Sequence, residues 1–184
     1  SLEEIWRTVS PILQEHSQAH DEKSHEEALW MLSIVSKYLR KDSSSYSQLA
    51  STFLSAVTVL ACSSGSIVSR NYATEILKNL CSVDAVTSFP VILRLASQYL
   101  HTEDDASRLG STVLLNQLVK TSELSICPFI RTLLPIAMSM MIDNVKEIAD
   151  LSANTFSKLV YLSPLVPENG KKIDVDLGHW NKKS

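Results

Sequence analysis

The chain has 184 residues, of which 45% are hydrophobic and 20% are charged, a composition typical of a globular protein and not of a disordered one. Its net charge of −3 and isoelectric point of about 5.9 argue against the basic surface of a nucleic-acid-binding protein. Ser, Arg, Lys or Pro interrupts every apolar stretch before the roughly 20 residues that a membrane span needs, so no membrane association is expected. The chain starts abruptly in a helical pattern, and we expect it to be a piece of a longer protein.

Apolar residues recur at three- and four-residue steps from the first residues onward, and this spacing predicts an all-α fold. Pro11 lies inside the first apolar stripe and predicts a kink or a break there, and Gly65 predicts the end of the third helix. The stripes of the first four predicted helices are Leu2, Ile5, Trp6, Val9, Ile12 and Leu13; Ala28, Leu32, Val35 and Leu39; Leu49, Phe53, Val57 and Leu60; and Tyr72, Ala73, Ile76, Leu77 and Leu80.

The second half of the chain predicts four more helices. The fifth lies around residues 89–100 and contains Pro90 near its start. The sixth follows the acidic run 103–105, whose negative charges favour a helix N-terminus. The seventh covers residues 127–142 with Pro128 near its beginning and Pro135 inside it, and the eighth begins after the polar break 143–144.

The eight helices form four pairs, and the second helix of each pair carries a similar pattern. A polar residue is followed three, seven and ten places later by small or apolar residues: His25 by Ala28, Leu32 and Val35; Arg70 by Ala73, Leu77 and Leu80; Arg108 by Ser111, Leu115 and Leu118; Lys146 by Ala149, Ala153 and Phe156. These polar residues are 45, 38 and 38 positions apart. Repeats of about 40 to 47 residues are typical of HEAT and armadillo proteins.

The sequence therefore predicts a HEAT/armadillo-like α-solenoid with repeats at 1–41, 42–82, 83–120 and 121–165, followed by a polar tail or linker at 166–184. In a solenoid each helix pair covers the apolar faces of its neighbours. The eighth helix has two apolar sides, and we expect one to pack on its partner helix and the other on the neighbouring repeat: Ile148, Thr155, Leu159 and Leu162 on the first, and Leu151, Phe156 and Val160 on the second.

Cysteines and histidines give little sign of chemistry. Cys62, Cys81 and Cys127 are far apart without a Cys-x-x-Cys pair, so reduced, buried thiols are expected and neither disulfides nor a zinc site. His16 and His20, with His25 nearby, have the spacing of metal ligands on a helix, but a solvated loop is the favoured interpretation. Cys127 and His101 could form a thiol–base pair, but nothing in the sequence orients one on the other.

Two further features have a structural interpretation beside a functional one. The acidic run 103–105 is interpreted as a helix cap in preference to a cation site. Met138, Met140 and Met141 are interpreted as core residues in preference to an adaptable binding surface. No glycine-rich phosphate loop and no nucleophile elbow occurs. We therefore predict no catalytic residue, no metal site and no cofactor.

The function that remains is the binding of a partner to an extended surface, because solenoids present such a surface along the second helices of the pairs. The candidate partner contacts are Glu75, Lys78, Gln117, Asn154 and Lys158 on the fourth, sixth and eighth helices, and Trp180 in the tail. Each of the first five is also explained by an ordinary solvated helix face. Trp180 is either an anchor onto a neighbouring module or part of a disordered tail.

Residues 107–165 resemble the last HEAT repeats before the motor in the TATA-binding-protein-associated Swi/Snf-type ATPases. The residues that carry this resemblance are Arg108 and Gly110 at a helix start, Pro128-Phe129-Ile130, Leu133-Leu134-Pro135, Asp143-Asn144 with Val145, Leu159-Val160, Leu162, and Pro164-Leu165. The resemblance covers about sixty residues, and the rest of the chain follows only the general HEAT pattern.

The resemblance implies a nuclear, non-catalytic scaffold within an ATPase that removes the TATA-binding protein from DNA. The expected partners are the TATA-binding protein, the ATPase domain of the parent protein, or both. Direct binding of nucleic acid is not expected, and a monomer is. The alternative is a HEAT-repeat protein-binding module of a transport receptor or of another cytoplasmic scaffold. A single closed helical bundle also fits the composition, and it would require the first and last helices to touch.

Overall fold

The computed structural model describes residues 2–14, 22–41 and 43–163. These residues form helices and no strand, which confirms the all-α prediction. The elements are α1 (Leu2–Gln14), α2 (Glu22–Ser36), α3 (Ser44–Gln48), a π-helical turn (Leu49–Phe53), α4 (Leu54–Ser63), α5 (Ile67–Tyr99), α6 (Asp105–Ser122), a 3-10 helix (Glu123–Phe129), α7 (Ile130–Met140) and α8 (Lys146–Leu162).

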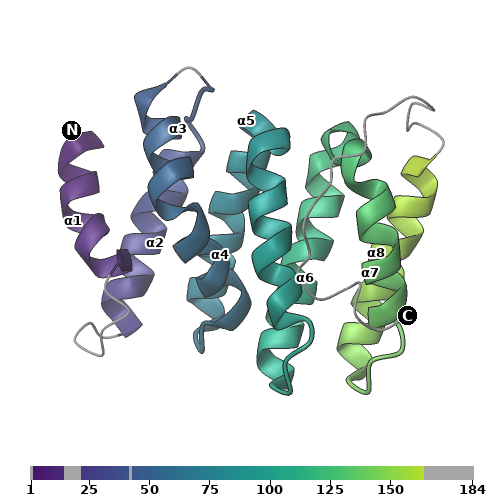
Figure 1. Cartoon of the computed structure of the whole chain (residues 1–184). Coiled ribbons are helices and arrows are strands. Elements are labelled where there is room, and N and C mark those ends of the chain that lie inside the picture. Colours follow the sequence, from purple (N-terminus) through teal and green to yellow (C-terminus); the bar gives the residue numbers. More distant parts are fainter. Residues whose placement is uncertain (1, 15–21, 42, 164–184) are drawn as a thin grey trace.

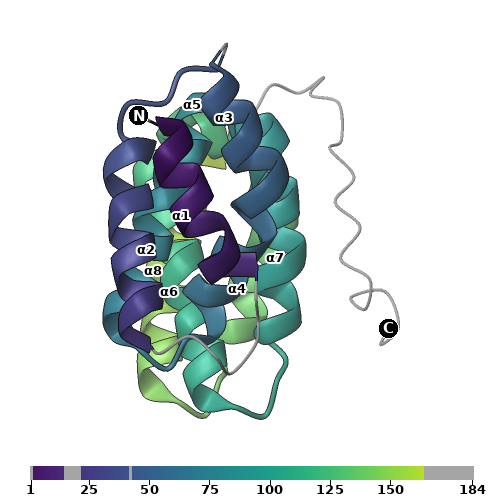
Figure 2. The ribbon, with the colours of Figure 1, turned by 90° about the vertical axis from the view of Figure 1, so that its left-hand side faces the viewer.

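The helices stand side by side in a row that begins with α1 and ends with α7 and α8 (Figure 1). Seen along the row, they form two layers (Figure 2). One layer, here called the B layer, consists of α2, the first part of α5, α6 and α8, which contact one another in that order. The other layer contains α3, α4, the second part of α5 and α7. The first and last helices therefore lie at opposite ends of the molecule and do not close into one bundle.

Helix α5 joins what the sequence predicts as the fourth and fifth helices. The backbone leaves helical geometry at Asp84, with φ −154° and ψ 84°, so two helical segments meet there without a loop. The Asp84 carboxylate caps the second segment by accepting bonds from the Thr87 N–H (3.4 Å) and hydroxyl (2.9 Å), and it pairs with Lys41 at 3.0 Å. Asp84 therefore acts as the helix start that a separate fifth helix would need.

By length and composition alone, α5 could cross a membrane. Half of its most apolar window is buried inside the protein, however, and the helix is bent at Asp84. Its apolar side chains Ile76, Leu77, Ile92 and Leu93 are all fully buried. Packing against α4 and α6 therefore accounts for this hydrophobicity.

Pro11 lies inside α1, and Asp104 marks the start of α6. Of the kink or break predicted at Pro11, the break does not occur, because α1 continues through this residue to Gln14. Asp104 caps α6, because its carboxylate accepts bonds from the N–H groups of Ala106 (3.3 Å) and Ser107 (3.0 Å) and from the Ser107 hydroxyl (2.6 Å). The bonds from Ser107 are the main reason why the pKa of Asp104 lies below its usual value. The cap interpretation of the acidic run is confirmed.

Arg108, at the start of α6, joins two loops. Its side chain is 90% covered, and it bonds to the loop before α6 and to the polar break before α8. The acceptors are the backbone carbonyls of Thr102 (3.0 Å) and Glu103 (3.1 Å), the carboxylates of Asp105 (2.7 Å) and Asp143 (3.0 and 3.3 Å), and the Asn144 side-chain oxygen (3.0 Å). Nearly buried charges are stable only when they are paired this completely. The third and fourth helix pairs are therefore locked together at Arg108.

Gly110, two residues further along α6, lies against the backbone of α4. A Cβ atom at this position would stand 2.2 Å from the Cys62 carbonyl oxygen and 3.0 Å from its carbon. Only glycine permits this approach, since backbone atoms cannot move aside as a flexible side chain can. Phe89 and Phe129 fill the core nearby with their ring centroids 4.8 Å apart.

Side-chain hydrogen bonds contribute to the contact between the first helix pair and the second. Ser66 donates to the Glu26 carboxylate at 2.5 Å, and the Asn79 amide donates to the Ser36 hydroxyl at 2.8 Å. Within the pair, the His25 ring lies 3.1 Å from the Ile12 carbonyl oxygen. The buried apolar residues of this pair are Val9, Leu13, Ala28, Leu29 and Leu32.

Candidate functional site

The outer side of the B layer is the surface on which the sequence places the candidate partner contacts. Five of these residues belong to its helices, Glu75 and Lys78 to α5, Gln117 to α6, and Asn154 and Lys158 to α8. Trp180 lies outside the described residues. The term B surface is used below for the exposed and half-buried positions of α2, the first part of α5, α6 and α8 that face away from the other layer.

Two interactions order side chains on this surface. Lys78 donates to the Glu75 carboxylate at 2.8 Å, one helical turn away on α5. On α8, the Lys158 ammonium lies 5.6 Å from the centre of the Tyr161 ring, within cation–π range, and Tyr161 is 75% exposed. Asn154 is exposed, and Gln117 is half-buried. The structure therefore distributes the predicted contacts along three helices and gathers them into no single pocket.

A depression between α2 and α5 is the part of the B surface that sequence reasoning missed. It has a volume of about 280 Å³, and its lining residues are Lys23, Glu26, Glu27, Trp30, Val68 and Tyr72. Trp30 and Val68 are 50% and 45% exposed. The sequence does indicate that Trp30 is exposed, because this residue falls between the positions of the predicted α2 stripe and therefore points away from the core.

Both signs of charge alternate along the B surface. Lys23 stands beside Glu26 and Glu27 at the depression, Lys78 pairs with Glu75, and α8 presents Lys158. Aromatic residues are enriched in protein–protein interfaces, where they often anchor the partner, whereas Lys and Glu are depleted there. A polyanion would call for a continuous basic stripe instead.

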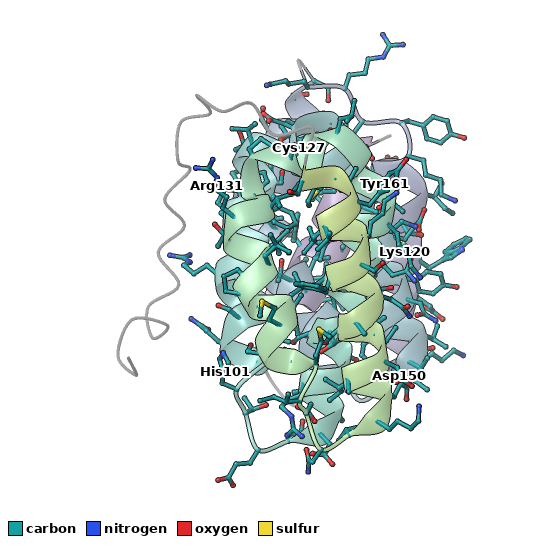
Figure 3. All side chains as sticks on the ribbon, turned by 90° about the vertical axis from the view of Figure 1, so that its right-hand side faces the viewer. His101, Lys120, Cys127, Arg131, Asp150 and Tyr161 are labelled. Carbon is teal, nitrogen blue, oxygen red and sulfur yellow. The ribbon has the colours of Figure 1, made fainter. Side chains whose placement is uncertain are left out.

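The thiols do not form a reactive site. Burial raises the pKa of Cys62 to about 11, although Ser111 lowers it slightly by hydrogen bonding, and burial raises the pKa of Cys81 to about 12. Both are therefore protonated at neutral pH and are not nucleophiles. Cys127 and His101 lie at opposite ends of the helices, so the imagined thiol–base pair is not formed (Figure 3). All three thiols are free and buried, as predicted.

Metal and small-molecule sites find little support. Within the described ranges, no three His, Cys, Asp or Glu residues are grouped to hold a metal ion. His16 and His20 lie outside those ranges. A cavity of about 20 Å³ between α6, α7 and α8 is lined by apolar residues and by Thr112, Ser152 and Thr155, and it has room for about one water molecule.

The three methionines behave differently from one another. Met140 is 5% exposed and belongs to the core, as predicted. Met138 and Met141 are 57% and 38% exposed, so the core interpretation is wrong for these two. Met138 lies on α7, and Met141 is the residue directly after it.

Helix α8 is covered on only one of its two apolar sides. Ile148, Ser152, Thr155, Leu159 and Leu162 are buried, close to the predicted first side. On the predicted second side, Leu151 and Phe156 are half-buried and Val160 is 49% exposed.

A comparison with known protein families, curated protein sequences and solved structures finds no match to the chain.

Proposed function

We propose that the chain is a non-catalytic HEAT-like scaffold that binds a protein partner through the B surface. The observation that carries this proposal is the exposed, aromatic and mixed-charge surface along one layer of a two-layer row of helix pairs. A second observation supports the repeat interpretation. Arg70 and Arg108 are 38 residues apart, and each reaches toward the following pair, Arg70 to the Ala106 carbonyl (3.5 Å) and Arg108 to Asp143.

The resemblance suggests the context of this scaffold. Arg108, Gly110 and Asp143-Asn144, which carry part of the resemblance, all act where one helix pair meets the next. Their positions support the interpretation of the motif as a junction between repeats. We therefore propose a nuclear, monomeric support for an ATPase that removes the TATA-binding protein from DNA, and the partner is either that protein or the ATPase domain.

A quantitative pull-down tests this proposal. The purified chain is titrated at moderate salt against the TATA-binding protein and, separately, against the isolated ATPase domain. The surface variant combines Trp30→Ala with Lys158→Glu, and we expect it to weaken binding about tenfold or more, since interface energy is concentrated in aromatic and charged anchors. The control is Arg131→Glu, which changes an exposed charge on α7 at the opposite edge (Figure 3).

The outcomes separate the parts of the proposal. Capture of the ATPase domain alone supports a linking role, and capture of the TATA-binding protein supports a recognition role. Equal weakening by the control variant would contradict the B surface as the binding site. Binding of neither protein by a chain that circular dichroism shows to be helical would contradict the proposed context.

A further inference from the structure

The depression between α2 and α5 lies between two bonds that hold these helices together. Before it along both helices, the Glu26 carboxylate accepts from the Ser66 hydroxyl at 2.5 Å. After it, the Asn79 amide donates to the Ser36 hydroxyl at 2.8 Å. The spacing of the two helices at the depression is therefore fixed on both sides. Its described lining residues are Lys23, Glu26, Glu27 and Trp30 on α2, and Val68 and Tyr72 on α5.

Two aromatic side chains form much of the apolar part of this lining. Trp30 comes from α2 and is 50% exposed, and Tyr72 comes from α5 and is half-buried. Val68 lies one helical turn before Tyr72 on the same helix. The face of an aromatic ring carries partial negative charge and attracts cations, and tryptophan does so most strongly. The aromatic part of the depression therefore favours a cation over an anion.

Carboxylates outnumber ammonium groups around the two rings. Glu27 lies one turn before Trp30, on the same side of α2. Glu26 is already bonded to Ser66, the N-cap residue of α5, whereas Glu27 is exposed and takes part in no ion pair of the described residues. Lys23 is also exposed, and its long side chain can extend into solvent. Glu27 is therefore the carboxylate that remains for a ligand.

The size of the depression limits what it can hold. Its volume of about 280 Å³ is just below the range of about 300–1,000 Å³ that is typical of pockets for small organic ligands. Glu27 and Trp30 are both exposed, so an occupant would be covered on one side only. These dimensions fit one long side chain of a partner protein better than a free cofactor or metabolite.

We infer that this depression binds an arginine side chain of the partner protein. A guanidinium group is planar, so it stacks on Trp30 while two of its N–H groups donate to the Glu27 carboxylate. A lysine ammonium has the same charge, but it has no plane to stack and is more strongly hydrated. The inference rests on the proposed function and deepens it, because it names the chemistry of the partner at one point of the B surface.

An NMR titration with a minimal probe tests the inference. The probe is Nα-acetyl-arginine amide, and the indole N–H signals of the isotope-labelled full chain report its binding. The chain has three tryptophans, and the variant Trp30→Phe identifies the signal of Trp30. We expect a saturable shift of this signal with a dissociation constant on the order of several millimolar, because one exposed cation–π contact and one exposed ion pair each contribute little. Nα-acetyl-citrulline amide, which has a similar shape without the charge, should produce no saturable shift.

Matched carboxylate variants test the role of Glu27. Glu27→Gln should weaken binding of the arginine probe about threefold or more, since it removes the charge but keeps the shape. Glu147→Gln, at an exposed carboxylate of α8, should leave binding unchanged. Both side chains are exposed, and circular dichroism checks that both variants keep the helical fold. Nα-acetyl-lysine amide should also bind about threefold or more weakly than the arginine probe, because it cannot stack.

Three results would overturn the inference. One is the absence of a saturable shift of the Trp30 signal. Another is an equal response to the citrulline or the lysine probe, because the depression would then not recognise a guanidinium group. The last is unchanged binding of the arginine probe by Glu27→Gln.

The pull-down described for the proposed function can fail separately from this titration. If the surface variant weakens capture of a protein partner but the arginine probe does not bind, the B-surface proposal stands and only the arginine inference is overturned. If the probe binds as expected but neither protein partner is captured, the arginine inference stands and the proposed context is overturned.

Discussion

The two terminal helix pairs are held to the rest of the row in different ways. The last pair, α7–α8, is joined to α6 through Arg108, which bonds to Asp143 and Asn144 before α8, and through Asn116, which bonds to two groups on α8. The bonds between the first pair, α1–α2, and α5 include Glu26–Ser66 and Ser36–Asn79. The junction of the last pair therefore contains a nearly buried ion pair, whereas these two bonds of the first pair each have at least one neutral partner.

Arg70 and Arg108 hold the same position in successive repeats, but they make different contacts. Arg70 occupies the position of Arg108 one repeat earlier, but it makes one long bond, and its buried Nε has no partner within the described residues. The clamp therefore depends on the acids and amides of the following turn as much as on the arginine. A cation at the helix start is necessary for this junction but is not sufficient.

The largest expected effect comes from removing the clamp. Arg108→Ala leaves Asp143 nearly buried without its cation, and removal of one partner from a buried pair costs about 3–5 kcal/mol. Arg70→Ala should cost less than about 1 kcal/mol, because only one 3.5 Å bond is lost. Urea unfolding of both variants measures the difference. Equal losses would contradict the contrast between the two junctions.

The next effect concerns the close approach of α6 to α4. Gly110→Ala introduces a Cβ that overlaps the Cys62 carbonyl, and we expect a loss of about 3 kcal/mol, at the upper end of what overpacking costs. Thermal unfolding followed by circular dichroism measures it. An Ala variant as stable as the wild type would mean that α6 moves away from α4 without loss of packing.

A third effect is acid destabilisation of the clamped end. Burial alone would raise the pKa of Asp143, but bonds from Arg108 and from the Val145 N–H offset this, and the pKa lies below its usual value. Such a carboxylate stabilises the fold above the unfolded-state pKa of about 3.9, and this stability is lost as the pH falls through the lower folded-state value. Asp143→Asn should therefore flatten the decline of the urea midpoint below about pH 4. It should also reduce stability at neutral pH, by about 1–3 kcal/mol.

The smallest effect sharpens the contrast at the other end. Asn79→Ala removes one bond to the first pair and should cost about 0.5–1.5 kcal/mol. Ser66→Ala removes the bond to Glu26 and also the N-cap of α5, so it should cost about 1 kcal/mol more. Hydrogen exchange should show α2 amides opening faster in both variants while α8 amides are unchanged. In the wild type, exchange in α2 should already be faster than in α8. The reverse order would mean that the clamp does not govern which end opens first.

Much of the fold could be predicted from the sequence because apolar spacing reports directly on which residues face a core. All eight expected helices have counterparts, and their buried stripes include Leu32, Phe53, Leu77 and Leu118. The junctions could not be predicted, since Arg108 and Asp143 are 35 residues apart and neither reveals its partner. The direct junction of two helical segments at Asp84 could not be predicted either. A side-chain cap can start a helix where the sequence contains no glycine or proline.

The candidate site was predicted only in part. The residues chosen on α5, α6 and α8 do lie on the B layer, because a helical repeat fixes their direction. Trp30 was not predicted as a surface residue, because the apolar stripe predicts core positions only and Trp30 lies off it. The core prediction for Met138 and Met141 is wrong because hydrophobicity alone does not show whether a neighbouring helix covers a residue. That depends on how the helices pack in the row.

The bend at Asp84 has a mechanical consequence. The second and third helix pairs share one continuous backbone through α5, and the 3-10 helix Glu123–Phe129 likewise joins the third pair to the fourth without a loop. At the bend itself, Asp84 bonds to Lys41 and Thr87. Bending that accommodates a curved partner is therefore expected between the first and second pairs, where α2 ends at Ser36 and α3 begins at Ser44.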